Sequence, residues 1–272
     1  MNDRTGRGTV MTVREVVWRS VAVLTLVLSI VTGPASIAQT TGGNELQKPR
    51  KCDYDINADC RTRDDKPRRQ DREGAPVDLT GYWVSVVTED WRWRMMTPPK
   101  GDIASIPLRA EGELATLAWD PDKDGDNCKS FGAPGLLRNP MRLRVQWQGD
   151  DTLRLETDHG MQTRLFHFGN QAAAAGPPTL QGDSTANWQE SGLRVVTTNL
   201  SPGYLRKNGV PYSAATVLTE YYDRISAFGD DWLIVTSVVN DPAYLSREFI
   251  TSTHFKELPD GSSWKPLPCE TG

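Results

Sequence analysis

The sequence lacks the short motifs by which several common enzyme classes are recognised. It contains no Gly-x-Ser-x-Gly, no Gly-rich nucleotide-binding loop and no Cys-x-x-Cys-His. The nucleophile elbow of serine hydrolases, nucleotide-dependent chemistry and c-type haem attachment are therefore not indicated. Histidine, the commonest acid–base residue, occurs only three times, which leaves few candidates for proton transfer.

Positive charge is also scarce. The 272 residues include 31 Lys and Arg against 35 Asp and Glu, for a formal net charge of −4. Sequence-independent binding to nucleic acid needs a concentrated basic face, so we do not expect nucleic acid as a partner. Hydrophobic residues make up 38% of the chain, which is enough for one globular core but low for several membrane spans.

The N-terminal region has the features of a secretory signal peptide. Arginines precede the apolar run Val21–Val31, and the small-residue site Ser36-Ile37-Ala38 follows it. The run is shorter than the ~20 residues of a comfortable membrane helix. We predict that residues 1–38 are a signal peptide cleaved after Ala38, leaving a periplasmic or secreted protein without a stable transmembrane span. An uncleaved anchor is the alternative, and Met11 is an alternative start.

Four cysteines remain after the predicted cleavage: Cys52, Cys60, Cys128 and Cys269. An even number in an oxidising compartment favours disulfides, for which several pairings are open. We favour Cys52–Cys60, which closes a small loop, and Cys128–Cys269, which ties the C-terminus to the middle of the chain. A zinc site is the rival, but there is no Cys-x-x-Cys pair and the histidines lie far away in sequence.

Residues 39–76 have the composition of a flexible, charged linker. They are dense in both charge signs and contain almost nothing to bury, so packing cannot offset the entropy of ordering. Apart from the small Cys52–Cys60 loop, we expect no fixed structure there. The folded domain is predicted to span residues 77–272.

Alternation of apolar and polar residues dominates the predicted domain. Residues 141–147, 153–156 and 162–168 are expected to form a three-stranded meander joined by polar turns. The other expected strands are 79–88, 193–200, 215–225, 232–239 and 247–256, with 91–96 as a candidate partner of the first.

One helix is expected before Pro121. Its apolar stripe consists of Leu108, Ala110, Leu114, Ala115, Leu117 and Ala118. Many short strands and a single helix predict an all-β fold, either a closed barrel or a sandwich. We favour an antiparallel up-and-down barrel of about eight or nine strands, with the short helix in an insertion.

The first expected strand reads Asp78-Leu-Thr-Gly-Tyr-Trp-Val84. Its Gly81 and Trp83 resemble the Gly-x-Trp opening of the lipocalins, members of the calycins, and Thr219-Glu220-Tyr221 is similar to the Thr-Asp-Tyr motif of that family. The resemblance implies an up-and-down barrel around a ligand cavity. It also implies that Trp83 closes the barrel base beside a basic residue of the last strand, here Lys256 or Arg247.

Residues 77–269 are also similar to a group of uncharacterised exported bacterial proteins. Those proteins begin with a comparable Gly-x-Trp-like strand and have a Cys-containing segment before a meander. This second likeness implies no activity.

The segment EDWRWRMM, residues 89–96, is a candidate ligand wall. Tryptophan and methionine offer large polarisable surfaces to an apolar or aromatic ligand, and an arginine could pair with a carboxylate or phosphate. Ordinary barrel core is the main alternative, and a membrane-disrupting patch is disfavoured within an acidic domain. The candidate residues in and near this segment are Trp83, Trp91, Trp93, Arg92 and Arg94.

A second candidate is PGYLRKNGVPYS, residues 202–213, which is expected to be a loop at the barrel mouth, where binding loops concentrate. It would contribute Tyr204, Arg206 and Tyr212 to a ligand site. The alternative is a connection whose tyrosines simply cover the end of the barrel.

The stretch WDPDKDGDNC matches the first half of an EF-hand calcium loop through Asp120, Asp122, Asp124 and Gly125. The position that should hold a bidentate glutamate is Phe131. We therefore favour a solvated acidic turn, expect no cofactor and keep calcium as the weaker alternative.

Two histidines, His167 and His254, lie in expected strands. Histidine titrates near neutrality, so both could bind a metal or exchange protons with Glu220 or Asp223 if they faced the barrel cavity. The sequence does not fix their faces, and a structural role is the more common one for a histidine in a strand.

These observations predict an exported, lipocalin-like protein that binds a small apolar or aromatic molecule in the barrel cavity. One alternative is a cofactor-free isomerase, cyclase or hydrolase that uses His167, His254 and Glu220. Another is an envelope-associated interaction protein tethered by residues 39–76. The sequence does not determine the oligomeric state.

Overall fold

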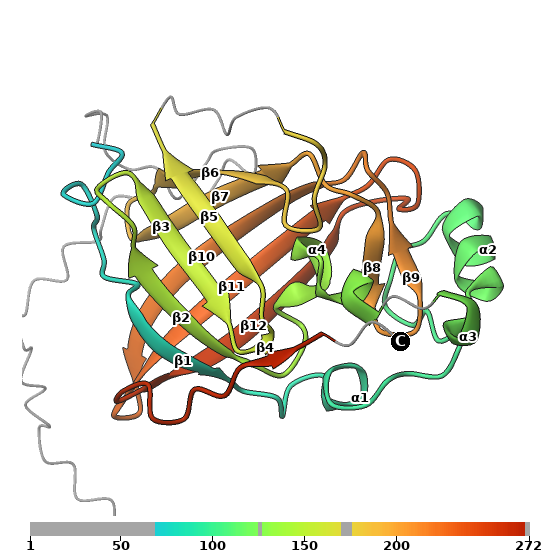
Figure 1. The fold of residues 1–272 in the computed structure, drawn as a ribbon, viewed down its shortest axis with the longest axis horizontal. Helices are drawn as coiled ribbons and strands as arrows, with labels where there is room; N and C mark the ends of the chain where they lie inside the picture. Colours follow the sequence, from blue (N-terminus) through green and yellow to red (C-terminus); the bar gives the residue numbers. More distant parts are fainter. Residues whose placement is uncertain (1–68, 125–126, 170–175, 270–272) are drawn as a thin grey trace, which may run out of the picture. The chain divides into compact units, whose positions relative to one another are not determined.

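A computed structural model describes residues 69–124, 127–169 and 176–269 of the chain. In it nine strands close into one barrel in the order β1-β12-β11-β10-β7-β6-β5-β3-β2 (Figure 1). Strand β1 pairs with β12 along one edge and with β2 along the other, which closes the barrel. The predicted all-β barrel is confirmed. The predicted signal peptide and the Cys52–Cys60 loop lie outside the described residues.

The elements have the following bounds. The barrel strands are β1 (Gly81–Ser85), β2 (Arg142–Trp147), β3 (Thr152–Thr157), β5 (Thr163–Phe168), β6 (Asp183–Trp188), β7 (Gly192–Thr198), β10 (Val217–Ala227), β11 (Asp230–Asn240) and β12 (Phe249–Leu258). Two small sheets pair β4 (His159–Gly160) with β13 (Leu267–Pro268) and β8 (Gly203–Arg206) with β9 (Val210–Tyr212). The insertion between β1 and β2 carries α1 (Trp91–Arg94), α2 (Ala110–Ala118), α3 (Pro121–Asp124), the 3₁₀ helix η2 (Asn127–Phe131) and α4 (Ala133–Leu136). In the described part of the chain, no helix has the length and apolar character needed to cross a membrane.

One strand pair departs from the antiparallel prediction, because β5 and β6 run parallel. Two parallel strands cannot be joined by a tight hairpin turn, and residues 169–182 separate β5 from β6 in the sequence. Strand β6 itself was missing from the predicted strands. Its inward residues include Ser184 and Ala186, which are too small and too polar to produce a clear apolar alternation.

Buried side chains occupy the interior of the barrel. Along strands such as β5 and β11, inward residues alternate with more exposed outward ones, as the period of two requires. The interior cluster includes Trp83, Leu143, Leu153, Phe166, Phe168, Trp188, Val195, Tyr222, Leu233 and Phe255. Because these side chains fill the space that we expected to hold a ligand, the ends of the barrel become the places to look for a site.

Trp83 has the buried position that the Gly-x-Trp pattern implies, but its basic neighbour differs. The indole N–H of Trp83 donates to the carbonyl of Leu79 at 3.2 Å. The guanidinium above its ring belongs to Arg224 of β10, 5.4 Å from the ring centre, rather than to Lys256 or Arg247.

An ion pair is buried among these apolar side chains. Arg164 of β5 and Glu220 of β10 approach to 2.7 Å, and both side chains are almost completely inaccessible to solvent. Arg164 also donates to the hydroxyl of Thr197 at 3.0 Å, and Thr197 is hydrogen-bonded to Ser184 at 2.8 Å. Since β5 and β10 are not neighbours in the sheet, the pair links two walls of the barrel through its interior.

The prediction of a strand at 91–96 is wrong, because this segment contains the helix α1. Strand β1 is already paired on both edges, so it offers no edge to a further strand. The chain turns at Asp90, whose φ is 49°. Arg94 is then buried beneath the helix, where it donates to the carbonyls of Val86 and Arg138.

The predicted helix is confirmed as α2, but its buried face is not the predicted one. Leu114 and Leu117 are 67% and 60% exposed, whereas Gly112 and Thr116 are buried. A Cβ on Gly112 would lie 2.8 Å from the carbonyl oxygen of Tyr244. Because Gly112 has no side chain, the helix backbone can lie close to the backbone of Tyr244, and a larger apolar residue at this position would prevent that contact.

Residues 202–213 form the β8–β9 hairpin instead of the predicted irregular loop. The hairpin covers a second apolar cluster that includes Leu205, Val210 and Tyr212 together with Leu218 and Val239 from barrel strands. Figure 1 shows β8 and β9 at the same end of the barrel as α1, α2 and α3. Hairpin and insertion thus share one end of the barrel.

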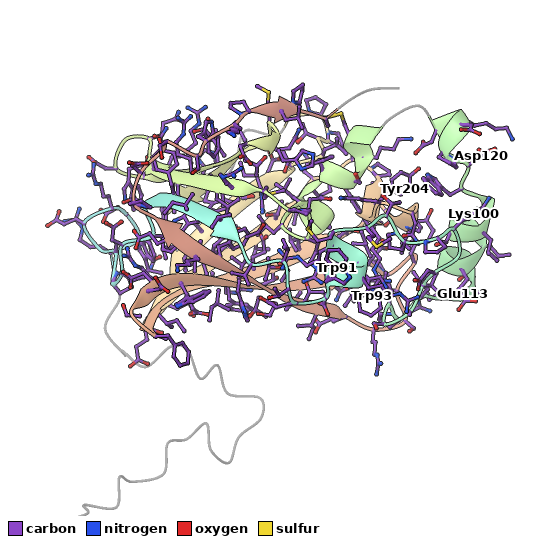
Figure 2. The ribbon with its side chains drawn as sticks, turned by 90° about the horizontal axis from the view of Figure 1, so that it is seen from below. Trp91, Trp93, Lys100, Glu113, Asp120 and Tyr204 are labelled. Carbon is purple, nitrogen blue, oxygen red and sulfur yellow. A yellow bond between two sulfur atoms is a disulfide. The ribbon has the colours of Figure 1, made fainter. Side chains whose placement is uncertain are left out.

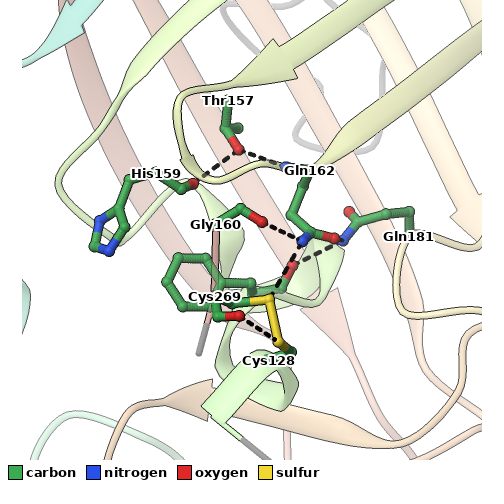
Figure 3. The surroundings of a disulfide bond; sticks show 8 residues. Cys128, Thr157, His159, Gly160, Gln162, Gln181 and Cys269 are labelled. Atoms are coloured by element: carbon green, nitrogen blue, oxygen red, sulfur yellow. Dashed lines mark hydrogen bonds between the residues drawn. A yellow bond between two sulfur atoms is a disulfide. The ribbon is translucent and has the colours of Figure 1, made fainter. Parts of the chain in front are cut away.

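The predicted disulfide between Cys128 and Cys269 is confirmed, with an S–S distance of 2.10 Å (Figure 3). It joins η2 to the segment that follows β13. The side-chain amide of Gln162 donates to the carbonyl of Gly160 at 2.6 Å and lies 3.8 Å from the sulfur of Cys269. These contacts fix the C-terminal segment against the outside of the barrel.

Removing this disulfide should destabilise the protein. The bonded residues are 141 apart in sequence, and a loop of this size restricts the unfolded chain by roughly 4–5 kcal/mol in the chain-entropy estimate. We expect the double variant Cys128→Ser/Cys269→Ser to lose about 4 kcal/mol of unfolding free energy in a denaturant titration. An unchanged denaturation midpoint would contradict this role.

The β10–β11 turn offers a stabilising substitution. Its two central residues, Phe228 and Gly229, have φ values of 57° and 81°, which are typical of a type I′ turn that favours Asn-Gly. Phe228 is 98% exposed, so its ring contributes no packing. We expect Phe228→Asn to raise the unfolding free energy by about 1 kcal/mol, measured by denaturant titration. Phe228→Ala, which lacks the conformational preference, is the matched control, and an equal gain in both variants would count against this explanation.

Candidate functional site

A cleft of about 360 Å³ opens at the end of the barrel that carries the β1–β2 insertion. The insertion contributes Trp93 of α1 and Arg138, which follows α4. The tip of the β8–β9 hairpin contributes Arg206 and Lys207, and the start of β12 contributes Phe249. Segments far apart in the sequence therefore meet in one cavity.

The hairpin tip is held firmly against the insertion. The buried side chain of Asn208 donates to the carbonyls of Pro99 and Asp102, at 2.9 and 3.0 Å. Gly209 has a φ of 78°, and a Cβ there would lie 2.1 Å from the ring of Trp119. Only glycine fits this position, so the turn that presents Arg206 and Lys207 is fixed by close packing.

Two guanidinium groups lie near the ring of Trp93. The guanidinium carbon of Arg206 is 4.8 Å from the ring centre, and that of Arg92 is 5.6 Å from it. Arg92 is exposed and forms an ion pair with Asp102 at 2.6 Å. Figure 2 shows Trp93 beside Trp91 on α1. Of the two arginines near the indole, Arg92 is therefore bound to a carboxylate, whereas Arg206 lines the cleft.

Arg206 has spare hydrogen-bonding capacity. Its buried Nη1 has no acceptor in the part of the chain that the structure describes, and the same is true of the indole N–H of Trp93. Burial lowers the pKa of Arg206 to about 10, with a further lowering by Arg138 that Asp102 opposes. The group stays protonated at neutral pH, so the cleft keeps a positive charge with an unfilled donor.

Lys207 is half-buried in the same cleft. Burial lowers the pKa of its ammonium group. Among the described residues, its side chain has no hydrogen-bond acceptor and no carboxylate partner. Lys207 also lines a neighbouring cavity of about 370 Å³, together with Trp119 and Tyr204.

The acidic residues of the cleft are occupied by other bases. Asp90 forms an ion pair with Arg138, and a carboxylate oxygen of Glu89 lies 2.8 Å from Nδ1 of His254. The positive charges of Arg206 and Lys207 are therefore not neutralised by a hydrogen-bonded carboxylate within the described residues. Such an arrangement attracts an anion.

The opposite end of the barrel holds a smaller cavity of about 300 Å³, lined by Trp147 and Trp188. The indole N–H of Trp188 donates to the carbonyl of Asp71 at 2.8 Å, so the segment before β1 covers this end. The polar group of this tryptophan already has its partner. This cavity is therefore a weaker candidate than the cleft.

The structure brings together only part of the predicted ligand-binding set. Trp93 and Arg206 line the cleft. Tyr204 lines the neighbouring cavity, where its hydroxyl donates to a carboxylate oxygen of Asp124 at 2.6 Å. The predicted alternation in EDWRWRMM did not select the right residues, because helix α1 turns Trp93 toward the cleft and leaves Trp91 54% exposed.

The remaining members of that set lie elsewhere. Trp83 is in the barrel core, Arg92 is on the outer surface and Arg94 is buried, where burial lowers its pKa to about 10. Tyr212 is buried in the second apolar cluster, and burial raises the pKa of its hydroxyl. A Cβ on Gly132 or Gly203 would collide with that hydroxyl, so Tyr212 is packed rather than exposed to a ligand.

The predicted acid–base group is not assembled. His167 lies on the outer face of β5 against the hydroxyl of Thr152, at 3.2 Å. His254 lies on the outer face of β12 and contacts Glu89. Glu220 points into the barrel interior and is paired with Arg164. The barrel wall separates both histidines from Glu220, so these three residues share no site.

The predicted calcium ligands are likewise not gathered. Asp120 forms an ion pair with Lys123 at 2.8 Å, and Asp124 binds Lys129, Trp119 and Tyr204. Among residues 69–124, 127–169 and 176–269, no group of three or more potential ligands could hold a metal ion.

Sequence reasoning missed Arg138 and did not select Lys207. Arg138 follows the buried Leu136 and Leu137, and a single arginine within an apolar stretch is a usable sign of a buried charge with a specific role. The only local signal for Lys207 is its place next to Arg206 and before an Asn-Gly turn.

Comparisons with known proteins leave the function to be argued from this geometry. The chain matches no protein-family model, no curated protein and no solved structure. The resemblance to the lipocalins stays a prediction.

Breaking the interior ion pair should destabilise the fold, as expected for a structural Glu220. Glu220→Gln leaves the buried charge of Arg164 unpaired, which costs roughly 3–5 kcal/mol of unfolding free energy. Lys123→Ala, at an exposed ion pair, is the control and should leave the denaturation midpoint essentially unchanged. Equal midpoints for Glu220→Gln and the unsubstituted protein would show that the interior pair contributes nothing.

Proposed function

We propose that this protein is an exported binding protein that holds a small organic anion with an aromatic or apolar body in the cleft at the barrel end. The observation that carries the proposal is the pair of cations, Arg206 and Lys207. Both line the cleft, and neither has a hydrogen-bonded carboxylate among the described residues. A bound anion would supply the missing partner.

Arg206 is the main contact for the anionic group. A guanidinium can give two parallel hydrogen bonds to a carboxylate or phosphate, and its Nη1 is without an acceptor in the described residues. Partial burial lowers the local dielectric and strengthens attraction to an anion. The ring of Trp93 behind the guanidinium limits its motion.

The body of the ligand would lie against the apolar wall of the cleft. Leu205, Phe249 and Ile250 line it together with Trp93. A volume of about 360 Å³ is at the lower end of the range for small-molecule pockets. This combination fits a compact aromatic acid better than a long lipid.

Export is supported by two features. Residues 1–38 have the order of basic, apolar and small residues that a signal peptide requires. The disulfide between Cys128 and Cys269 suits an oxidising compartment.

Calorimetric titration with two anionic probes and one neutral probe tests the proposal. 3-Phenyllactate and phenyl phosphate should bind, whereas 3-phenylpropane-1,2-diol, which keeps a ring but has no charge, should bind far more weakly. Arg206→Ala should weaken both anions by about tenfold or more, the value of a charged hydrogen bond. Higher salt should weaken them as well.

Arg92→Ala is the matched control, because Arg92 contacts the same Trp93 but is exposed and paired with Asp102. It should retain the affinity of the unsubstituted protein. No binding of either anion at millimolar concentration would contradict the proposal, as would equal losses in the two variants.

A further inference from the structure

Lys207 has surroundings that no other described lysine shares. Lys123, Lys129 and Lys256 form ion pairs with Asp120, Asp124 and Asp230, and Lys100 and Lys265 are exposed. Lys207 is half-buried, lines two cavities and has no acidic partner in the described part of the chain. A lysine that only keeps the surface soluble is normally exposed to solvent, so the half-buried position of Lys207 indicates another role.

The position of Lys207 raises the share of its neutral amine above that of an exposed lysine. Nothing among the described residues stabilises the ammonium form by an ion pair, and burial lowers the pKa of the group. A neutral lysine amine beside a cavity is a nucleophile toward carbonyl carbon.

We propose that Lys207 forms a reversible imine with the carbonyl carbon of a 2-oxo carboxylate whose carboxylate group is held by Arg206. This inference rests on the proposed function and specifies the ligand class of the same cleft. Arg206 and Lys207 are consecutive residues at the fixed hairpin tip, and both line the cleft. A 2-oxo carboxylate carries the two groups that these cleft-lining side chains would engage, an anion for Arg206 and a carbonyl carbon for Lys207. The apolar wall of Trp93 and Phe249 selects an aromatic substituent.

The reaction needs no further reagent. The nitrogen lone pair of Lys207 attacks the carbonyl carbon and forms a C–N bond, giving a carbinolamine after proton transfer from nitrogen to oxygen. A proton from the solvent then lets the hydroxyl group leave as water while the nitrogen lone pair forms the C=N bond, giving an imine protonated at nitrogen. Addition of water reverses each step, so the ligand is captured and released without oxidation or reduction.

Reductive trapping tests this step. The full chain is incubated with phenylpyruvate and sodium cyanoborohydride, digested and analysed by peptide mass spectrometry. Reduction of the imine fixes an adduct whose added mass equals phenylpyruvate less one oxygen atom. We expect this adduct at Lys207 at a yield well above that at the exposed Lys123, and a fall in yield when excess 3-phenyllactate occupies the cleft.

Lys207→Arg is the matched variant, because it keeps the positive charge but cannot form the imine. It should lose the phenylpyruvate adduct, and binding of 3-phenyllactate is measured by calorimetry on the unsubstituted protein. If 3-phenyllactate binds but adducts are missing or spread evenly over the exposed lysines, the imine is overturned and the anion site stands. If neither compound binds, the anion site and the imine both fall.

Discussion

The arrangement outside the barrel wall depends on one constraint: β1 is hydrogen-bonded along both edges. Its pairing with β2 and β12 closes the sheet, so the chain that leaves β1 has no edge to join. Residues 86–141 therefore fold as an insertion at the barrel end. That insertion brings Trp93 and Arg138 beside the tip of the β8–β9 hairpin and forms the cleft.

Among the described residues, the charged groups inside the barrel and those at its end differ in whether they have a charged partner. Inside, aromatic side chains surround the Arg164–Glu220 pair, in which each charge has an oppositely charged partner. A buried ion pair adds little net stability, but removing one partner costs several kcal/mol of unfolding free energy. Such a pair therefore favours one packing arrangement of the interior over others. At the end, Arg206 and Lys207 have no hydrogen-bonded carboxylate in the part of the chain that the structure describes. Unpaired charge is costly to bury, so its presence in a cleft is an argument for a ligand.

Much of the barrel was predictable from the sequence, because strands such as β2 alternate apolar and polar residues. The Cys128–Cys269 pairing was also the favoured one. The sequence of α1 alternates in the same way, but both edges of β1 are already paired, so a further strand has no place beside it. Strand β6 was not predicted, because small inward residues such as Ser184 give no clear alternation of apolar and polar residues. Among the residues of the cleft, Arg206 and Trp93 were predicted as ligand-binding residues. That Lys207 has no carboxylate partner among the described residues depends on contacts between segments far apart in the sequence, which the sequence does not reveal.

The most direct test of the anion cleft is the indole N–H region of the NMR spectrum during titration with 3-phenyllactate. Trp93 lines the cleft, Trp83 is buried in the barrel and Trp188 lies at the opposite end. A saturable shift of the Trp93 signal, with the Trp83 and Trp188 signals unchanged, is the result that this account predicts. A shift of Trp83 or Trp188 without Trp93 would place the ligand inside the barrel or at its other end, and would contradict it.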